Sequence, residues 1–379
     1  MLRLFFISMF YGFATLLAAQ MPELKITARA DNGHGMLCMA GNKRVLIVEG
    51  TPQQMGAAHG ELMADLVPSV VRETMALVGA AYTIKEGIWF YDKIDEIYSR
   101  AAPHTPQRFI DECLAMAAAA GVSSRDALCG NFFPELFHCS GVAVRGKATV
   151  DGRVVHARVL DYMRDINLQS YTLVQVFIPK DGYAWMSLGY AGFLGSVTAM
   201  NEHGLAIGEM GGLSDEIWDG MPMTFLIREM AEKNRSVDEA LALINRVPRT
   251  CEYYYVISDA SKNMVGIRAR PDEVLVLQPG EQHELLPPVP SDTVMFSANQ
   301  RAVKLSERLH ENYGKIDAQL MIEIIKRPVA MRSNLHNAIF LPESLDMWFA
   351  DAGKKTPACD EPYTMVNLKA AIDFYNSNR

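Results

Sequence analysis

The sequence predicts an α+β protein in which helices cover stacked antiparallel sheets. Of the 379 residues, 49% are hydrophobic and only 21% are charged, so a substantial core can form. Helix-like patterning dominates residues 21–138, whereas an alternating, strand-like pattern begins at Cys139. Later helices come in pairs between such strands, and this order favours a layered α+β fold over a βαβ winding.

Residues 1–20 have the pattern of a secretory signal peptide. Arg3 supplies a positive charge, the stretch from Leu4 to Ala19 is apolar, and small residues end it. No later run reaches the roughly 18 apolar residues that a membrane span needs. We therefore expect an exported protein, periplasmic or extracellular, with no stable membrane span once the peptide is removed. An uncleaved N-terminal anchor is the alternative.

Residues 21–138 are expected to be mainly helical after one short strand at 44–49. Thr51 and Pro52 supply an N-cap and a first-turn proline. The predicted helices are Gln53–Leu66 with a continuation past Pro68 to about Val78, Lys85–Arg100, Thr105–Ala119, and one that begins at Ser123 or Ser124 and runs towards Phe137.

Residues 139–379 are expected to supply the sheets. Two strands flank a turn region that holds Gly146, Asp151 and Gly152. A capping box at 236–239 begins a helix. The remaining predicted elements are, in order, strands at 171–178, 183–188, 195–200 and 205–209, helices at 223–233 and 236–246, strands at 253–258, 264–269 and 274–277, helices at 301–312 and 317–325, and strands at 335–341 and 346–349.

Charge and cysteine spacing exclude some classes of function. The net charge of -8 is spread along the chain without a basic stripe, which argues against nucleic-acid binding. The six cysteines show no CxxC or Cys/His cluster, so neither a metal site nor a cofactor is expected. If Cys139 is a free nucleophile, five cysteines remain, and the count supports no disulfide framework.

Cys139 lies where the helical pattern gives way to strands, and Arg158 and Asp161 follow on the returning strand. The thiolate is the reactive form, but a cysteine with an ordinary pKa of about 8.5 is mostly protonated at neutral pH. His138 would point to the opposite face of the strand, and His156 is a partner only in a suitable register. The α-amino group of Cys139, as the first residue of a processed chain, is an alternative base, because its reference pKa is about 7.7–8.0.

The register of the hairpin decides whether Arg158 can act on Cys139. A tight turn at Asp151-Gly152 would place Arg158 roughly 20 Å along the strand from Cys139. A longer loop from Gly146 to Gly152 would bring the two together. Catalysis requires the longer loop, with which the Arg158 charge can lower the thiol pKa or hold an acyl oxygen.

Motifs along nearly the whole mature chain resemble those of one known family. They are Thr51-Pro-Gln-Gln-Met-Gly-Ala-Ala-His-Gly60, Cys139-Ser-Gly-Val-Ala-Val, Gly146-Lys-Ala-Thr-Val-Asp-Gly-Arg, Arg158-Val-Leu-Asp161, Ala199-Met-Asn-Glu-His-Gly-Leu205, Ser297-Ala-Asn299 and Asn334-Leu-His-Asn-Ala-Ile-Phe-Leu-Pro342. Their order is similar to that of the isopenicillin-N acyltransferase (acyl-coenzyme A:6-aminopenicillanic acid acyltransferase) family. That family is related to choloylglycine hydrolases and penicillin V acylases, all N-terminal-nucleophile hydrolases.

The resemblance implies a four-layer αββα fold and autocatalytic cleavage between His138 and Cys139. Residues 21–138 would then be the small chain, and residues 139–379 the large, catalytic chain. Arg332 is a weaker match to a substrate-binding arginine. The residues that the resemblance makes catalytic are Cys139, Arg158, Asp161, Asn201 and Asn299. Three residues depart from the family pattern: Ser140, Val159 and Gln300 stand where threonine, asparagine and histidine are usual.

Simpler structural roles compete with these assignments. Arg158 and Asp161 could form an ion pair at a strand end. Asn201 could be a turn residue, Asn299 a helix cap and Arg332 a surface charge.

We therefore expect a self-processing N-terminal cysteine hydrolase or acyltransferase that cleaves or forms a linear amide C–N bond through a Cys139 thioester. The expected partner is a small N-acyl amide, with acyl-coenzyme A as a second candidate substrate. A homo-oligomer is left open. A papain-like cysteine protease would need a separate histidine base, and a non-catalytic exported binding protein would keep an intact chain and an unreactive thiol.

Overall fold

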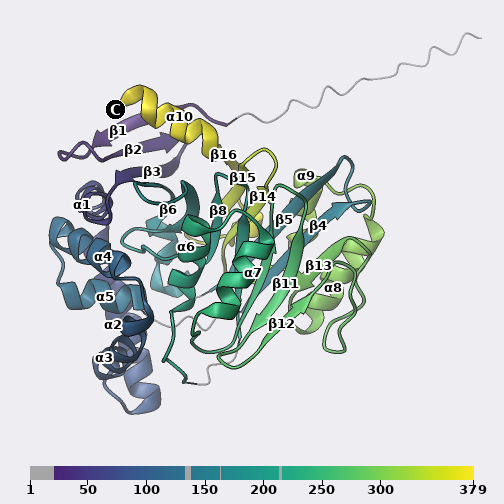
Figure 1. The fold of residues 1–379 in the computed structure, drawn as a ribbon, viewed down its shortest axis with the longest axis horizontal. Coiled ribbons are helices and arrows are strands. Elements are labelled where there is room, and N and C mark those ends of the chain that lie inside the picture. Colours follow the sequence, from purple (N-terminus) through teal and green to yellow (C-terminus); the bar gives the residue numbers. More distant parts are fainter. Residues whose placement is uncertain (1–20, 133–137, 163, 213–215) are drawn as a thin grey trace, which may run out of the picture.

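The computed structural model describes residues 21–132, 138–162, 164–212 and 216–379. The predicted signal peptide and the predicted end of a helix near Phe137 lie outside these residues. Two sheets lie face to face at the centre of the molecule, and helices cover their outer faces (Figure 1). The predicted α+β class is therefore confirmed.

The large sheet has ten strands in the order β1-β2-β3-β6-β7-β8-β9-β10-β11-β12. β3 and β6 pair in parallel, and the other neighbours pair antiparallel. The strands are β1 Leu24–Arg29, β2 Gly35–Ala40, β3 Lys43–Gly50, β6 Thr172–Pro179, β7 Trp185–Tyr190, β8 Thr198–Asn201, β9 Ala206–Gly211, β10 Tyr253–Ser258, β11 Met264–Ala269 and β12 Val274–Leu277.

The small sheet has six antiparallel strands in the order β13-β4-β5-β14-β15-β16. It packs on the large sheet through contacts of β4 and β5 with β9, and of β13 with β10 and β11. The strands are β4 His138–Gly146, β5 Gly152–Asp161, β13 Thr293–Phe296, β14 Asn334–Leu341, β15 Asp346–Asp351 and β16 Thr364–Asn367.

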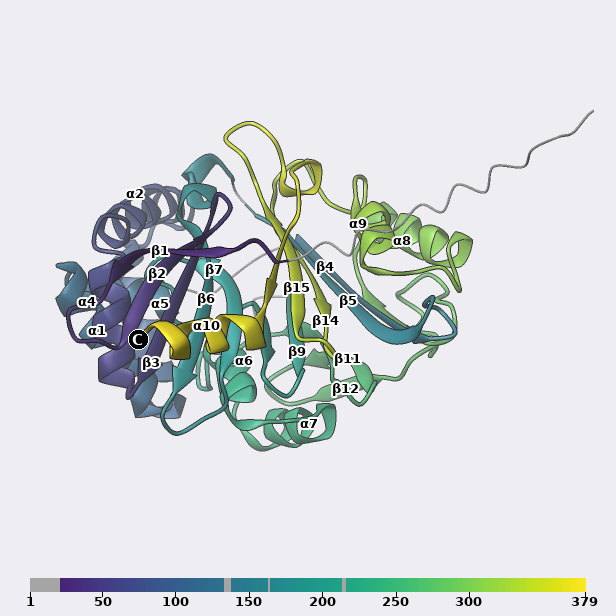
Figure 2. The same cartoon turned by 90° about the horizontal axis from the view of Figure 1, so that it is seen from above.

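The helices complete four layers. Helices α6 and α7 pack on the large sheet. Helix α9, with α8 beside it, packs on the small sheet. Helices α1–α5 gather beside β1–β3, at one end of the large sheet (Figure 2). The helices are α1 Pro52–Leu62, α2 Val67–Glu86, α3 Phe90–Ala101, α4 Gln107–Ala120, α5 Ser124–Phe132, α6 Met223–Lys233, α7 Val237–Arg246, α8 Asn299–Glu311, α9 Ala318–Ile325 and α10 Leu368–Asn378.

Local signals place several helix ends. Thr51 caps α1 by accepting from the Gln54 N–H, and the Gln54 side chain bonds back to the Thr51 N–H. Ser236 accepts from the Glu239 N–H at the start of α7.

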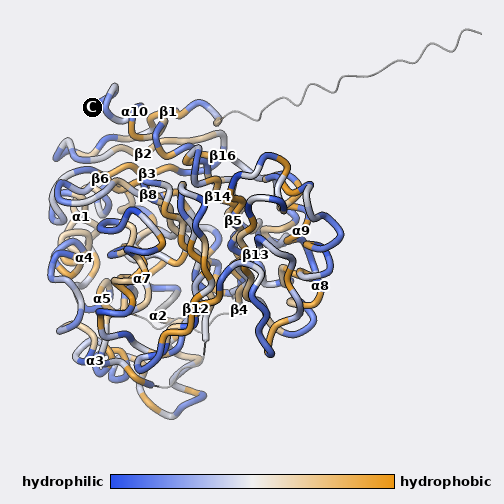
Figure 3. The backbone as a smooth tube through the Cα atoms, turned by 45° about the vertical axis from the view of Figure 1, so that its right-hand side comes forward, coloured by the Kyte–Doolittle hydropathy of each residue, from blue (hydrophilic) through white to orange (hydrophobic). Residues whose placement is uncertain are grey.

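Hydrophobic stretches run along the interior strands, and hydrophilic ones along the outer turns (Figure 3).

The first part of the chain differs from the expectation of one strand followed by helices. Three strands precede the helices, and only β3 was predicted. Because β3 pairs with β6, this part of the chain contributes to the large sheet rather than forming a separate helical unit. β13, β16 and α10 were also missed. In residues 21–132, 138–162, 164–212 and 216–379, no helix is both long and apolar enough to cross a membrane.

Candidate active site

The β4–β5 hairpin has the longer loop. Gly146 pairs with Gly152, so residues 147–151 form the connection, and both glycines have positive φ angles (57° and 74°) that suit glycine. Arg158 pairs with Gly141, two residues along β4 from Cys139. Two residues correspond to roughly 7 Å along a strand, so the register condition for catalysis is met and the tight turn is excluded.

Cys139, Gly141 and Arg158 share the face of the small sheet that packs on the large sheet. Cys139 is buried in an apolar cluster that includes Met210 of β9. A Cβ atom on Gly141 would lie only 2.6 Å from the Met210 sulfur. Glycine at this position therefore lets β9 approach the strand that carries Cys139.

Arg158 forms a buried ion pair with Glu209 across the interface between the sheets. Its Nη2 donates to Glu209 Oε2 at 3.2 Å, and both side chains are 0% exposed. Burial raises the pKa of Glu209, and the Arg158 charge opposes this effect. Glu209 was not predicted as a site residue, although a glutamate within an apolar strand is itself a signal, because buried charges need partners.

The Cys139 thiol is neutral in the intact chain. Burial raises its pKa to about 12, whereas the Arg158 charge and a hydrogen bond from the Asp161 main chain act in the opposite direction. The expected lowering by Arg158 is thus present, but desolvation outweighs it. The thiol needs a base before it can act as a nucleophile.

Asp161 lies at the level of the His138–Cys139 bond, since its Cα pairs with that of His138. Its carboxylate is buried and accepts hydrogen bonds from Arg301 Nη2 and, at 2.9 Å, from the Met331 N–H. Burial raises the pKa of Asp161 to about 6, and the nearby Arg301 charge opposes the rise. The strand-end ion pair of Asp161 is therefore made with Arg301 and not with Arg158.

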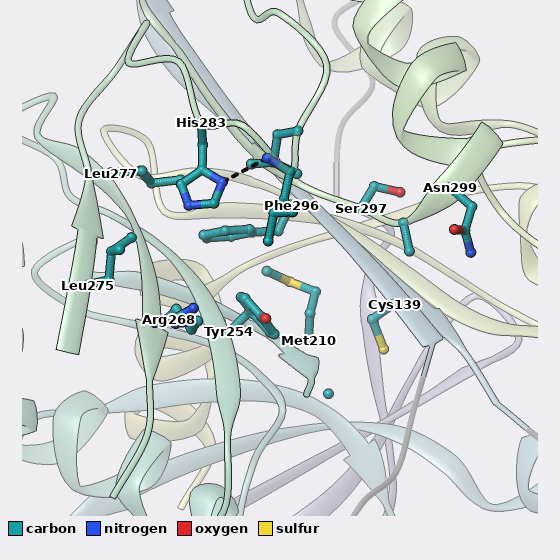
Figure 4. A pocket seen from close by; sticks show the side chains of 14 residues that line it. Cys139, Met210, Tyr254, Arg268, Leu275, Leu277, His283, Phe296, Ser297 and Asn299 are labelled. Atoms are coloured by element: carbon teal, nitrogen blue, oxygen red, sulfur yellow. Dashed lines mark hydrogen bonds between the residues drawn. The ribbon is translucent and has the colours of Figure 1, made fainter. Parts of the chain in front are cut away.

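Asn299 lies at the cavity that holds Cys139 (Figure 4). It is the first residue of α8 and has a φ angle of 55°, which asparagine tolerates better than most residues. Ala298 is the N-cap and makes no side-chain capping bond, so Asn299 does not have the helix-capping role that competed with catalysis.

The cavity has a volume of about 320 Å³, within the usual range for small-molecule sites. Cys139 and Asn299 lie at one end of it, and Arg268 and His283 lie at the other (Figure 4). Most of the wall between them is apolar. The larger apolar lining residues are Met210, Leu275, Leu277, Leu285, Leu286 and Phe296.

Two predicted site residues are not brought to Cys139. Asn201 is the last residue of β8 and lies beside the start of β9, whereas Met210 lies near the end of β9. The Asn201 Nδ2 donates to the carbonyls of Ala231 and Asn234. Its Oδ1 accepts from two N–H groups of the β8–β9 turn, so the turn role is the one that the structure supports. Arg332 is exposed, and the described residues that line the cavity do not include it.

His156 does not lie where it could act as a base on Cys139. His156 pairs with Ala143, roughly 13 Å along β4 from Cys139, and its Nδ1 lies 2.8 Å from Ser258 Oγ. Burial lowers the pKa of His156 to about 3. Cys38, Cys113, Cys129, Cys139 and Cys359 are free thiols. The described residues contain no cluster of three or more His, Cys, Asp or Glu side chains that could hold a metal ion.

Comparison with known proteins supports the resemblance drawn from the motifs. A sequence model of the acyl-coenzyme A:6-aminopenicillanic acid acyl-transferase family matches residues 149–283, a span that contains Arg158 and Asp161 but not Cys139 or Asn299. The chain is 24% identical to protein dcd1B of Dictyostelium discoideum over 82% of this chain and 69% of that protein.

The chain is also similar to an amidase. It is 21% identical to the N-acylethanolamine-hydrolyzing acid amidase of Rattus norvegicus, over 46% of this chain and 50% of the rat protein. Among solved structures, the Caenorhabditis elegans ortholog of that amidase has a TM-score of 0.45 and 18% identity, covering 54% of this chain and 93% of the other.

Proposed function

We propose that this chain is a self-processing N-terminal cysteine hydrolase or acyltransferase that acts on a linear amide C–N bond. One observation carries the proposal: Cys139 and Asn299 meet at one cavity, with Arg158 on the same face of the hairpin as Cys139. The acyl-transferase family match over residues 149–283 and the likeness to the rat amidase support the same class of reaction.

Self-cleavage is the first step of the proposal. The Cys139 sulfur attacks the His138 carbonyl carbon, a C–S bond forms as the C–N bond breaks, and the thiol proton passes to the released amine. Water then hydrolyses the thioester, which leaves a His138 carboxylate, a free thiol and a free α-amine on Cys139. The raised pKa of the Cys139 thiol in the intact chain keeps the reactive thiolate scarce, which is consistent with slow cleavage.

Turnover of substrate repeats this chemistry with the new amine as base. The Cys139 amine takes the thiol proton and delivers it to the leaving amine of the substrate, and the acyl group stays on sulfur as a thioester. Asn299 donates to the acyl oxygen as negative charge develops, a contribution typically worth ~3 kcal/mol. Asp161 lies level with the amine and orients it.

The substrate is proposed to be a small N-acyl amide with an apolar acyl group. The leucines, Met210 and Phe296 of the cavity wall favour such a group. Water as the acceptor of the thioester gives hydrolysis, and an amine gives acyl transfer, with acyl-coenzyme A as an alternative acyl donor. The predicted signal peptide supports export from the cytoplasm.

Mass spectrometry and N-terminal sequencing test the proposal directly. Wild type is expected to yield two fragments on a denaturing gel, one of which begins at Cys139, and Cys139→Ala a single chain. The fragments should co-elute under native conditions, because β3 of the first pairs with β6 of the second. Cys251→Ala is the control, since Cys251 is buried outside the cavity. A folded wild type that stays whole would contradict self-processing.

A further inference from the structure

We propose that Arg301 is a positioning residue of this site, which ties the strand carrying Cys139, the strand carrying Asp161 and the helix start carrying Asn299 into one unit. The inference rests on the function proposed above and extends it to a residue outside the cavity. Arg301 belongs to the first turn of α8, on the outer side of the small sheet.

The guanidinium group of Arg301 makes contacts with three separate segments. Its Nη2 donates to Asp161 Oδ2 and, at 2.9 Å, to Ser140 Oγ, the side chain next to Cys139. Its Nε donates to the Val329 carbonyl at 2.6 Å. The Arg301 side chain is 14% exposed and that of Asp161 is 0% exposed, so water screens the ion pair little.

These contacts require arginine rather than any cation. The planar fork presents several donors in fixed directions, whereas lysine presents a single ammonium on a flexible stem. One ammonium cannot reach the Val329 carbonyl, Ser140 and Asp161 with the same geometry. Ser140 is held a second time, because its Oγ lies 2.7 Å from Ser297 Oγ on the segment that leads into α8.

Arg301 also fixes the start of α8. The N-cap of this helix makes no side-chain hydrogen bond, so its first turn lacks the usual local anchor. Arg301 supplies a tertiary anchor in its place. Asn299 stands two residues earlier in the same turn, so release of Arg301 frees the residue that faces Cys139 across the end of the cavity.

The Arg301 charge acts on Asp161 together with several other groups. Those that influence the Asp161 carboxyl are Arg301 from α8 and Arg158 from β5, and the thiols near it are Cys139 of β4 and Cys359. Burial raises the pKa of Asp161, and Arg301 holds it down. Loss of Arg301 therefore raises that pKa further, and the carboxylate becomes protonated at a higher pH.

The test compares Arg301→Gln and Arg301→Lys with Arg308→Gln. Arg308 lies on the same helix and donates to the carbonyls of Ile324 and Lys326, away from Asp161. The readouts are the rate of appearance of the Cys139 N-terminus and the pH dependence of kcat/KM on an N-acyl amide. Arg301→Gln is expected to slow cleavage about tenfold. It should also move the acid limb of the kcat/KM profile, where activity falls at low pH, upward by about one pH unit.

Arg301→Lys should slow cleavage as well but leave the acid limb close to that of wild type, because the charge is kept. Arg308→Gln should change neither readout. Cleavage at the wild-type rate together with an unchanged acid limb in Arg301→Gln would overturn the role of Arg301. So would slower cleavage and a shifted acid limb in Arg308→Gln equal to those in Arg301→Gln. A wild type that does not cleave at all would instead overturn the proposed function.

Discussion

Replacing Arg158 with methionine tests the ion pair that joins the two sheets beneath the site. The substitution keeps much of the side-chain length and leaves Glu209 buried opposite an apolar group. It is best made in the Cys139→Ala background, where the chain is expected to stay intact and the unfolding of one species is measured. Arg153→Met is the matched control, since Arg153 lies on the same strand and pairs with Asp151 at an exposed site.

The size of the expected stability loss follows from the geometry of the Arg158–Glu209 ion pair. Two charges 3.2 Å apart interact by about 5 kcal/mol at an effective dielectric constant of 20. Removal of one partner of a buried pair costs about 3–5 kcal/mol in measured cases, because the remaining charge is uncompensated. The exposed pair of Arg153 is worth at most about 1 kcal/mol.

The stability deficit of Arg158→Met should depend on pH in one direction. Burial raises the pKa of Glu209 above its unfolded value, and loss of Arg158 raises it further. A carboxyl with a raised folded pKa favours the folded state at low pH, and this contribution is lost as the pH rises through the folded pKa. The deficit of Arg158→Met relative to its parent should therefore grow from pH 5 to pH 8.

Urea unfolding of the Cys139→Ala parent, Arg158→Met, Arg153→Met and Arg158→Met with Glu209→Gln measures these differences. The double substitution should recover most of the loss, because it removes the uncompensated charge. A loss below about 1 kcal/mol, or no recovery in the double variant, would show that the pair is not the energetic link described above.

Three further predictions concern single positions. Asn299→Ala should lower kcat about 10²–10³-fold, because Asn299 is proposed to act on the acyl oxygen. It should also cost about 1 kcal/mol of stability, because the side chain is exposed but the φ angle of 55° suits asparagine better than alanine; equal kcat in steady-state assays would contradict the catalytic role. Gly141→Ala should destabilise the protein by about 1–3 kcal/mol through the contact with Met210, and Met210→Ala in the same chain should restore part of the loss in thermal unfolding. Asn201→Ala should lower Tm through its lost turn hydrogen bonds while the residual folded enzyme keeps its KM, and a selective loss of kcat at full stability would return Asn201 to the catalytic site.

Much of what lies close to Cys139 along the chain was predictable, because it depends on local signals. The change from helical to alternating pattern marks the start of β4, whereas only the structure decided between the two possible β4–β5 loops and placed Arg158 opposite Gly141. Helix caps such as Thr51 were predictable for the same reason. Motif order along the chain added the expectation that Asn299 lies near Cys139.

The tertiary structure alone decided which distant residues complete the site. Glu209 faces Arg158 only because β9 packs across β5, and Arg301 reaches Asp161 only because α8 covers the small sheet. Strand pairing also decided that Asn201 lies away from Cys139, because Asn201 ends β8 beside the start of β9.

The ionisation state of the Cys139 thiol likewise depends on tertiary packing as well as on local sequence. Residue patterns alone predicted that a cysteine follows a helical segment and opens a strand, with an arginine and an aspartate on the next strand. Whether the thiol is ionised depends on burial between two sheets, and desolvation there outweighs the Arg158 charge. Burial is a property of contacts between segments far apart in the chain, so local residue patterns do not determine it.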